Sequence, residues 1–144
     1  MLFRKAQIQT ILSSNIGRPF KYGRHDCFTL CRSVYTSIFG NVLPRVSYRT
    51  EEEAVDLFKE YSWHNYLIDH GYIVEHIKHE DDIVYFMIAK LANGIESAHI
   101  SYDGYIHSVD STCGGHKVPN RCYNLYRKNL DITVYKTCLS YPHS

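Results

Sequence analysis

The sequence predicts an α+β fold on two observations: the spacing of apolar residues changes part-way along the chain, and hairpin dipeptides occur after that change. Before residue 71 apolar residues recur every three or four positions, the period of an amphipathic helix. From Tyr72 onward they form short runs around Asn93-Gly94 and Asp103-Gly104, dipeptides typical of β-hairpin turns. Helices followed by an antiparallel sheet define the α+β class, and 144 residues suit one domain spanning residues 1–144.

Four helices are expected in the N-terminal half. The clearest begins at Asp26 or Cys27 and ends at Gly40, since glycine favours a helix stop. Its apolar residues advance in alternating steps of three and one, which predicts a helix with one face in the core. These residues are Cys27, Leu30, Cys31, Val34, Tyr35, Ile38 and Phe39. The other helices are expected at Phe3–Ser14, from the capping box Thr50–Glu53 to about Tyr61, and at Trp63–Asp69.

Five strands are expected after the helices. The apolar run Ile83–Ala89 predicts a central strand that is buried on both faces. The two hairpin dipeptides bracket the expected strand Ser97–Tyr102, which makes it antiparallel to its neighbours. The remaining strands are expected at Tyr72–Ile77, Tyr105–Asp110 and Ile132–Thr137.

Composition narrows the functional classes. With 16 Lys and Arg against 15 Asp and Glu, the formal charge of +1 argues against a surface that binds nucleic-acid phosphates. The run Ile83–Ala89 is too short to span a membrane, and Met1–Gln7 lacks the apolar stretch of a signal peptide. We therefore expect a protein made in a cytoplasm, whose five cysteines are reduced thiols. The 13 tyrosines suit a surface that contacts protein or carbohydrate, or a tyrosine-rich sheet.

Cys27 is the first candidate for chemistry, because it lies in the first turn of the core-facing helix. Unpaired amides and the positive end of the helix dipole favour a thiolate at that place. A thiol nucleophile needs a base, and His99 lies in a strand of the sheet on which this helix is expected to pack. We therefore pair Cys27 with His99.

The hairpin after His99 decides which polar residue can hold the second nitrogen of its ring. With a two-residue turn at Asp103-Gly104, His99 lies opposite Ser108 and shares its face of the sheet with Asp110. With a three-residue loop the register shifts by one, and His107 lies directly across from His99. The sequence leaves both registers open.

Three segments together resemble the NlpC-like cysteine peptidases. Residues 17–30, Gly-Arg-Pro-Phe-Lys-Tyr-Gly-Arg-His-Asp-Cys-Phe-Thr-Leu, are similar to the segment that carries the nucleophile of that family. Asp82–Phe86 is similar to its Gly-Asp-Ile/Leu-Val-Phe strand, and Ala98–Ser108 is similar to its hairpin with two histidines. The resemblance is closest to the compact members found in bacteriophage tails, which share an apolar-Gly-x-x-Leu-Pro stretch, here Phe39–Pro44.

The resemblance implies a papain-like fold, with the nucleophile helix packed on a C-terminal antiparallel sheet. It implies that Cys27 is the nucleophile and His99 the general base. It further implies that His107 is the third residue, which orients His99, with Asp110 as the alternative. Tyr22 would line the oxyanion site beside the backbone amide of Cys27. We expect no cofactor.

The same resemblance implies the substrate and the partners. The enzymes of this family cut amide bonds in the peptide stems of bacterial peptidoglycan, so we expect those peptides as substrate. Other phage tail proteins are the expected neighbours, in the virion, and we expect neither nucleic acid binding nor membrane insertion. Because the near-neutral chain has little attraction to an anionic cell wall and no recognisable wall-binding module, assembly into a tail would deliver it.

Several alternatives stay open. Cys27 could be an inert thiol of the core, as free cysteines often are. A zinc site is the metal alternative, drawing on Cys27, Cys31, Cys113, Cys122 and His116. The sequence has no Cys-x2-Cys knuckle, however, so we expect no metal. The protein could also be a structural tail-tip or assembly protein that keeps the fold without turnover, a CHAP-type amidase, or an effector-like Cys-His hydrolase.

Overall fold

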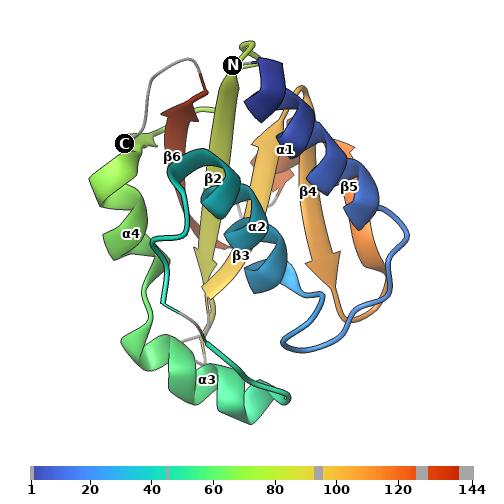
Figure 1. Ribbon diagram of the computed structural model, residues 1–144, viewed down its shortest axis with the longest axis vertical. Helices are drawn as coiled ribbons and strands as arrows, with labels where there is room; N and C mark the ends of the chain where they lie inside the picture. Colours follow the sequence, from blue (N-terminus) through green and yellow to red (C-terminus); the bar gives the residue numbers. More distant parts are fainter. Residues whose placement is uncertain (1, 45, 93–95, 126–129, 140–144) are drawn as a thin grey trace.

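The computed structural model describes residues 2–44, 46–92, 96–125 and 130–139. Within these ranges the helices are α1 (Leu2–Asn15), α2 (Cys27–Phe39), α3 (Glu51–Glu60) and α4 (Trp63–His70), with a short 3₁₀ helix η1 (Asn120–Cys122). The strands are β1 (Tyr72–Val74), β2 (Ile83–Lys90), β3 (Glu96–Tyr102), β4 (Tyr105–Asp110), β5 (Gly114–Pro119) and β6 (Asp131–Cys138). The predicted α+β class is confirmed (Figure 1). In the described part of the chain, no helix is both long enough and apolar enough to cross a membrane.

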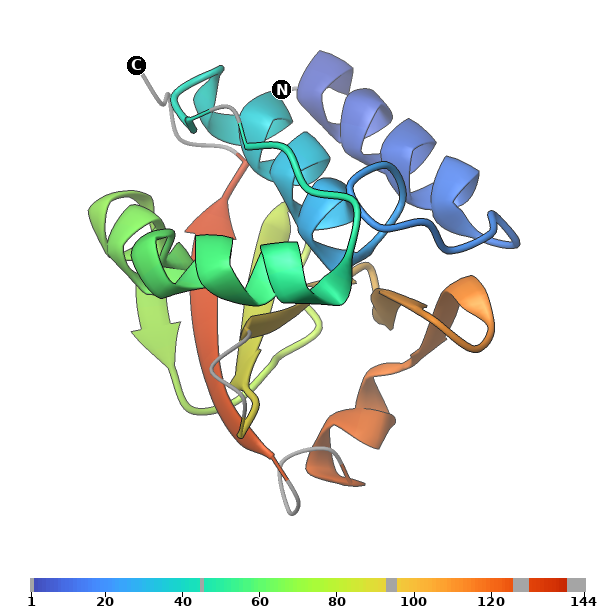
Figure 2. The ribbon, with the colours of Figure 1, turned by 90° about the horizontal axis from the view of Figure 1, so that it is seen from below.

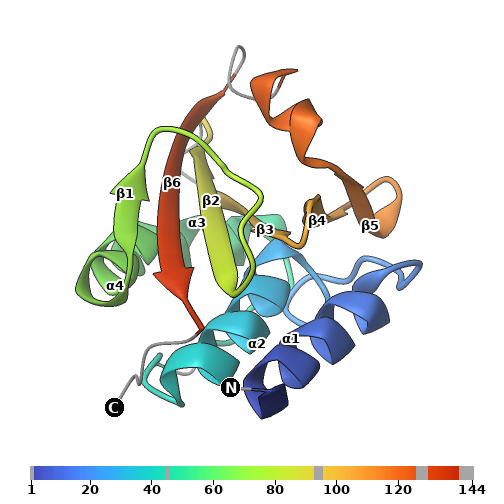
Figure 3. The same cartoon turned by 90° about the horizontal axis from the view of Figure 1, so that it is seen from above.

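The strands form one antiparallel sheet in the order β1-β6-β2-β3-β4-β5. Helices α1 and α2 lie side by side across one face of this sheet, with α2 against β3 and β4 (Figures 1 and 2). Helix α4 packs near β1 and β6. Figure 3 shows that the segment containing η1 lies on the opposite side of the sheet from α1 and α2. Because α2 packs on β3 and β4, it meets the sheet at these two strands.

Each face of the sheet carries its own apolar cluster. The larger cluster lies between helices and sheet and includes Val34 and Tyr35 of α2. The smaller cluster lies on the other face and includes Met87, Ile106 and Tyr123. Strand β2 supplies alternate residues to both clusters, and all but its last residue are buried. The prediction of a central strand buried on both faces is confirmed.

Helix α2 begins at Cys27, as the sequence predicts, because Asp26 caps it. One carboxylate oxygen of Asp26 accepts the Thr29 amide at 2.8 Å, and the Thr29 hydroxyl accepts the Asp26 amide at 2.9 Å. This reciprocal capping box satisfies two backbone donors near the start of the helix. The predicted apolar face is buried except at its first position, where Cys27 is half-buried and the neighbouring Phe28 is buried instead.

The capping box predicted at Thr50–Glu53 forms only in part. The Glu53 amide donates to the Thr50 hydroxyl at 3.2 Å, as expected. The Glu53 carboxylate accepts the Arg49 amide at 2.7 Å, one residue earlier than the box requires. Helix α3 still begins at Glu51, since the Thr50 cap is in place.

The β3–β4 hairpin has a two-residue turn. Asp103 and Gly104 have φ angles of 51° and 87°, both in the left-handed region that a type I′ turn requires. Ile100 therefore pairs with His107, which is the register of a two-residue turn. The turn predicted at Asn93-Gly94 lies outside the described residues.

Strand β5 is absent from the sequence prediction, because Gly114-Gly115 begins it without an apolar alternation. It forms where its backbone packs against the loop after α1. The Gly115 amide donates to the Arg18 carbonyl, and the Gly115 carbonyl accepts the Gly17 amide, both at 2.9 Å. A Cβ atom on Gly115 would lie 1.7 Å from the carbonyl oxygen of Asn15, so only glycine permits this approach.

The other strands differ from prediction at their ends. Strand β1 was predicted to reach Ile77 but stops at Val74, and its pairing with β6 stops at the same residue. Strand β6 is longer than predicted and spans Asp131–Cys138, because β2 pairs with it along that whole length.

Candidate active site

Cys27 is the first residue of α2, and its sulfur faces the backbone of β3. The backbone amides of Ala98 and of Phe28 in the first helical turn lie close enough to this sulfur to lower the pKa of the thiol. In β3, the residues that pair with β4 run from Ile100 to Tyr102, and Ala98 precedes them. The thiol is therefore held against the residue that immediately precedes His99.

Burial decides the protonation of Cys27. It raises the pKa of the thiol to about 11; the Ala98 amide opposes this rise, and the Asp26 carboxylate adds to it. The thiol is therefore protonated at neutral pH. The expectation that the helix start favours a thiolate is wrong for this resting state, because desolvation of the charge outweighs the nearby amides.

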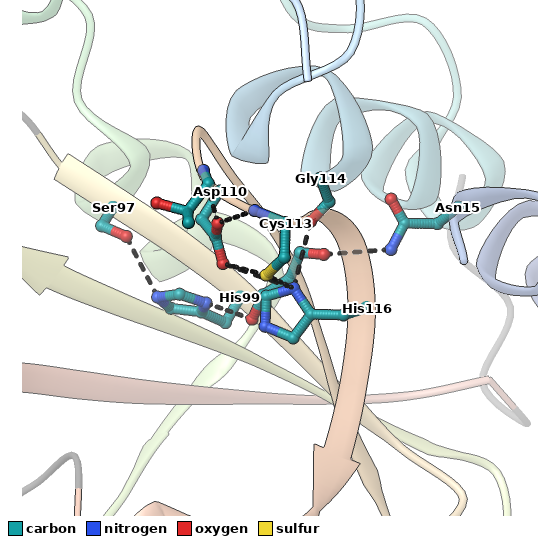
Figure 4. Close-up of polar contacts among 9 residues, drawn as sticks. Asn15, Ser97, His99, Asp110, Cys113, Gly114 and His116 are labelled. Carbon is teal, nitrogen blue, oxygen red and sulfur yellow. Dashed lines mark hydrogen bonds and ion pairs between the residues drawn. The ribbon is translucent and has the colours of Figure 1, made fainter. Parts of the chain in front are cut away.

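Both ring nitrogens of His99 contact serine hydroxyls (Figure 4). Its Nδ1 lies 2.6 Å from the hydroxyl oxygen of Ser108 on β4, and its Nε2 lies 3.0 Å from that of Ser97 on β3. Burial lowers the pKa of His99 to about 4; the positive charge of His116 also lowers it, while Asp110 raises it. The imidazole is therefore neutral at neutral pH, the form that can accept a proton.

The predicted position of His107 across from His99 is wrong. Because the turn has two residues rather than three, His107 pairs with Ile100 and shares the face of the sheet that carries the helices. There it lines a pocket of about 140 Å³ beside Leu12 of α1, and burial lowers its pKa to about 4, with a further decrease from Lys117. Ser108 occupies the position that was expected for His107.

Tyr22 lies close enough to Cys27 for Cys27 to affect the pKa of its phenol. Burial raises the pKa of the Tyr22 phenol, and the charges of Glu51, Asp26 and Cys27 raise it further. Its ring packs edge-on against Phe20, with centroids 4.7 Å apart. The phenol therefore keeps its proton at neutral pH and can donate it in a hydrogen bond, as an oxyanion site requires.

The turn before Cys27 is fixed by residues that the sequence analysis did not single out. The second carboxylate oxygen of Asp26 accepts the Gly23 amide at 2.9 Å and also the Tyr48 hydroxyl. Gly23 has a φ of 76°, and a Cβ atom there would lie 2.0 Å from the Tyr48 carbonyl oxygen. The spacing Asp26-x-x-Thr29, which is a capping-box pattern, is the sequence signal that could have identified Asp26.

Asp110 belongs to a second polar group, formed with Cys113 and His116 at the β4–β5 hairpin (Figure 4). The Cys113 thiol donates to Oδ2 of Asp110 at 3.0 Å, and Nδ1 of His116 lies 3.4 Å from the same oxygen. The Asp110 charge reaches His99, but the hydrogen bonds described for its carboxylate lie within this turn. The zinc alternative grouped Cys113 and His116 with other cysteines, and the structure brings them to Asp110 instead.

Comparison with known protein families supplies a classification for the N-terminal half. Residues 3–78 match the family described as a domain of unknown function, DUF6950, and they make up more than half of the chain. The chain belongs to the DUF6950 family. The region shared with DUF6950 contains Tyr22 and Cys27, whereas His99 lies beyond it. No curated protein matches the sequence.

In this DUF6950 protein, Cys27 lies against Ala98 of β3, and the next residue, His99, pairs with Met87 on the face of the sheet opposite the helices. Cys27 supplies a thiol, His99 a neutral imidazole, and Tyr22 a phenolic donor. Asp110 adds a negative charge near His99, whereas His107 lies on the other face of the sheet. A thiol, a base and a hydrogen-bond donor are the groups that acyl transfer requires.

Proposed function

We propose that this DUF6950 protein is a cysteine hydrolase with a papain-like arrangement, in which Cys27 is the nucleophile and His99 the general base. The observation that carries the proposal is that the Ala98 amide lies close enough to the Cys27 thiol to lower its pKa. This contact joins the start of α2 to the strand residue next to His99, so the reactive helix and the histidine strand meet at this point. An antiparallel sheet under that helix supports the papain-like assignment.

The protonation states favour general-base catalysis over a preformed ion pair. Because burial raises the pKa of the Cys27 thiol and lowers that of the His99 imidazole, the neutral pair is preferred at neutral pH. His99 would take the thiol proton as the sulfur attacks the carbonyl carbon, and would then give it to the leaving amine. Water would hydrolyse the resulting thioester and regenerate the thiol. The Cys27 amide and the Tyr22 hydroxyl would stabilise the oxyanion.

We propose peptide stems of bacterial peptidoglycan as the substrate and a phage tail as the place of action. Support comes from the resemblance of residues 17–30 and of the hairpin Ala98–Ser108 to compact tail-associated NlpC-like peptidases. The formal charge of +1 gives the chain little attraction to an anionic wall, so neighbouring tail subunits would bring it there.

Mass spectrometry of the products tests the substrate assignment. Purified peptidoglycan is incubated with the wild-type chain, with Cys27→Ala, and with Cys122→Ser as the matched control. We expect peptides cut within the stem from the wild type and from the control, and none from Cys27→Ala. Whole stems released from the sugar would indicate an amidase, and no products from the wild-type chain would contradict the assignment.

A structural tail protein without turnover is the second candidate, and two observations favour it. The Cys27 thiol is protonated, and both nitrogens of His99 already contact serine hydroxyls. Such a protein would copurify with virions yet release no peptides, whereas an active hydrolase would do both. A free lysin would be absent from virions and active when added to cells from outside.

A further inference from the structure

We propose that the β4–β5 turn binds one divalent metal ion of the zinc class through Asp110, Cys113 and His116. Ligand atoms of these three side chains lie within 4.8 Å of one another. Each ligand follows the previous one by three residues, so the end of β4, the turn after it and the start of β5 supply one ligand each. Carboxylate oxygen, thiolate sulfur and imidazole nitrogen are the donors that zinc takes in proteins. The proposal does not rest on the proposed hydrolysis, although Asp110 and His116 also affect the pKa of His99.

Two of the three distances between ligand atoms already match a tetrahedral zinc site. Nδ1 of His116 lies 3.4 Å from Oδ2 of Asp110 and 3.5 Å from Sγ of Cys113. Zinc bonds of about 2.0–2.3 Å at tetrahedral angles separate nitrogen from oxygen by about 3.4 Å and nitrogen from sulfur by about 3.6 Å. The third distance, from Sγ to Oδ2, is 3.0 Å because a thiol proton lies between them. When a metal ion replaces that proton, the distance from Sγ to Oδ2 must increase by about 0.6 Å.

The backbone holds the ligands in place before any ion arrives. Oδ1 of Asp110 accepts the amides of Thr112 at 2.8 Å and Cys113 at 2.7 Å, which leaves Oδ2 directed at the other two ligands (Figure 4). The strand that carries His116 is fixed in turn by the hydrogen bonds of Gly115 to the loop after α1. Preorganised ligands lose little conformational entropy on binding, which favours affinity.

Binding would exchange one proton for the ion. The Cys113 thiol gives its proton to solvent, and sulfur and Oδ2 of Asp110 then bind the metal. His116 moves its proton from Nδ1 to Nε2, and Nδ1 gives up its contact with the Gly114 carbonyl at 3.1 Å. One carboxylate and one thiolate neutralise a divalent charge. Cys113 is exposed, so the ion can enter from solvent, and water completes the fourth position.

The donor set selects the kind of ion. Thiolate and imidazole bind zinc, cobalt and nickel, whereas magnesium and calcium require oxygen ligands. Cobalt is the probe of choice, because it replaces zinc in tetrahedral sites and shows a thiolate-to-metal absorption band. The wild-type chain, treated with chelator and kept reduced with a phosphine, is titrated with Co²⁺ and then with Zn²⁺. We expect one equivalent of Co²⁺ to produce tetrahedral visible bands and the thiolate band, and Zn²⁺ to remove both.

Matched variants locate the ion. Removing a residue that only contacts a metal ligand typically costs about 10–100-fold in metal affinity. Because Cys113 and His116 would bind the ion directly, we expect Cys113→Ser and His116→Ala each to weaken Co²⁺ binding at least about 100-fold. Asp110→Asn keeps the oxygen that accepts the turn amides and should weaken binding without unfolding the turn. Cys122→Ser and Cys27→Ala should bind like the wild type. The absence of stoichiometric binding by the wild type would overturn the proposal, as would binding that survives Cys113→Ser or is lost in Cys122→Ser.

Discussion

Ser108 faces His99 across the β3–β4 hairpin, with its hydroxyl oxygen 2.6 Å from Nδ1 of the imidazole. Ser108 is buried, and its carbonyl oxygen accepts the side-chain amide of Asn15 at 3.1 Å, which ties this part of β4 to α1. Ser97 contacts the other nitrogen at 3.0 Å and is only half-buried. We infer that Ser108 holds the His99 ring in position, and that the contact between Ser97 and Nε2 breaks when Nε2 accepts a proton.

Removing these two hydroxyls should therefore have unequal effects on hydrolysis. We expect Ser108→Ala to lower kcat about 10- to 100-fold with little change in KM, because a mispositioned base fails in the transition state. Ser97→Ala should change kcat less than about threefold. Steady-state rates of peptide release measure both. A larger loss in Ser97→Ala than in Ser108→Ala would reverse the roles.

Alkylation of Cys27 should be slow at neutral pH. Because burial raises the thiol pKa to about 11, the thiolate fraction should rise about tenfold for each pH unit from about 7 to about 10. Rates of iodoacetamide modification, followed by peptide mass spectrometry at Cys27, measure this dependence. In denaturant the same cysteine should react faster, since it loses the desolvation that raises its pKa. A rate that is already maximal at neutral pH would mean that the resting thiol is ionised.

Acid should destabilise the protein through two histidines, one buried and one half-buried, whose pKa is lowered in the fold. Burial lowers the pKa of both His99 and His107 to about 4. For His99, the charge of His116 lowers the pKa further and that of Asp110 opposes the decrease. For His107, the charge of Lys117 lowers the pKa further. An unfolded imidazole has a pKa of about 6.5, so the unfolded state takes up protons first as the pH falls. The free energy of unfolding should be unaffected above about pH 7 and should decrease between about pH 6.5 and pH 4.

Each of the two histidines should account for up to about 3 kcal/mol of that decrease. Urea unfolding of the wild type, His99→Gln and His107→Gln across this pH range measures the contributions. Each variant should show a shallower acid dependence than the wild type. Parallel curves for all three proteins would show that neither ring is buried in its neutral form.

Gly115 should tolerate no side chain. A Cβ atom there would lie 1.7 Å from the Asn15 carbonyl oxygen, and the Gly115 backbone is hydrogen-bonded to Arg18 at 2.9 Å. We expect Gly115→Ala to cost about 3 kcal/mol or more, since the strand must shift to make room. Gly40→Ala is the matched control: its φ of 87° and ψ of −179° strain any side chain, but nothing lies within 4 Å, so it should cost about 1–3 kcal/mol from the backbone alone. Equal losses in the two variants would contradict the close packing of β5.

The sequence was sufficient for the elements whose signal is local. The steps of three and one in α2 and the apolar run of β2 each depend on neighbouring residues, and both elements were placed within one or two positions. The Asp103-Gly104 turn was also recognised. Strand β5 was missed because it depends on a contact between Gly115 and a loop about a hundred residues away in sequence, which no local pattern encodes.

At the candidate site, the sequence identified residue types better than their environment. His107 was paired with His99 on the basis of a motif, but a one-residue difference in loop length moves it to the other face of the sheet. The thiolate expected at Cys27 followed from the helix start, while the desolvation that opposes it comes from packing against β3. Cys113 and His116 were grouped with other cysteines and Asp110 was noted apart from them, and only the geometry of the β4–β5 hairpin brings the three together.

The rate of peptide release from purified peptidoglycan tests the central claim most directly. It should be measured for the wild type, Cys27→Ala, His99→Ala and the control Cys122→Ser, each checked for native folding. We expect kcat/KM to fall at least about 1,000-fold in the first two variants and to stay within about twofold of the wild type in the control. Hydrolysis that persists in a folded Cys27→Ala variant would contradict the assignment of Cys27 and His99 as nucleophile and base.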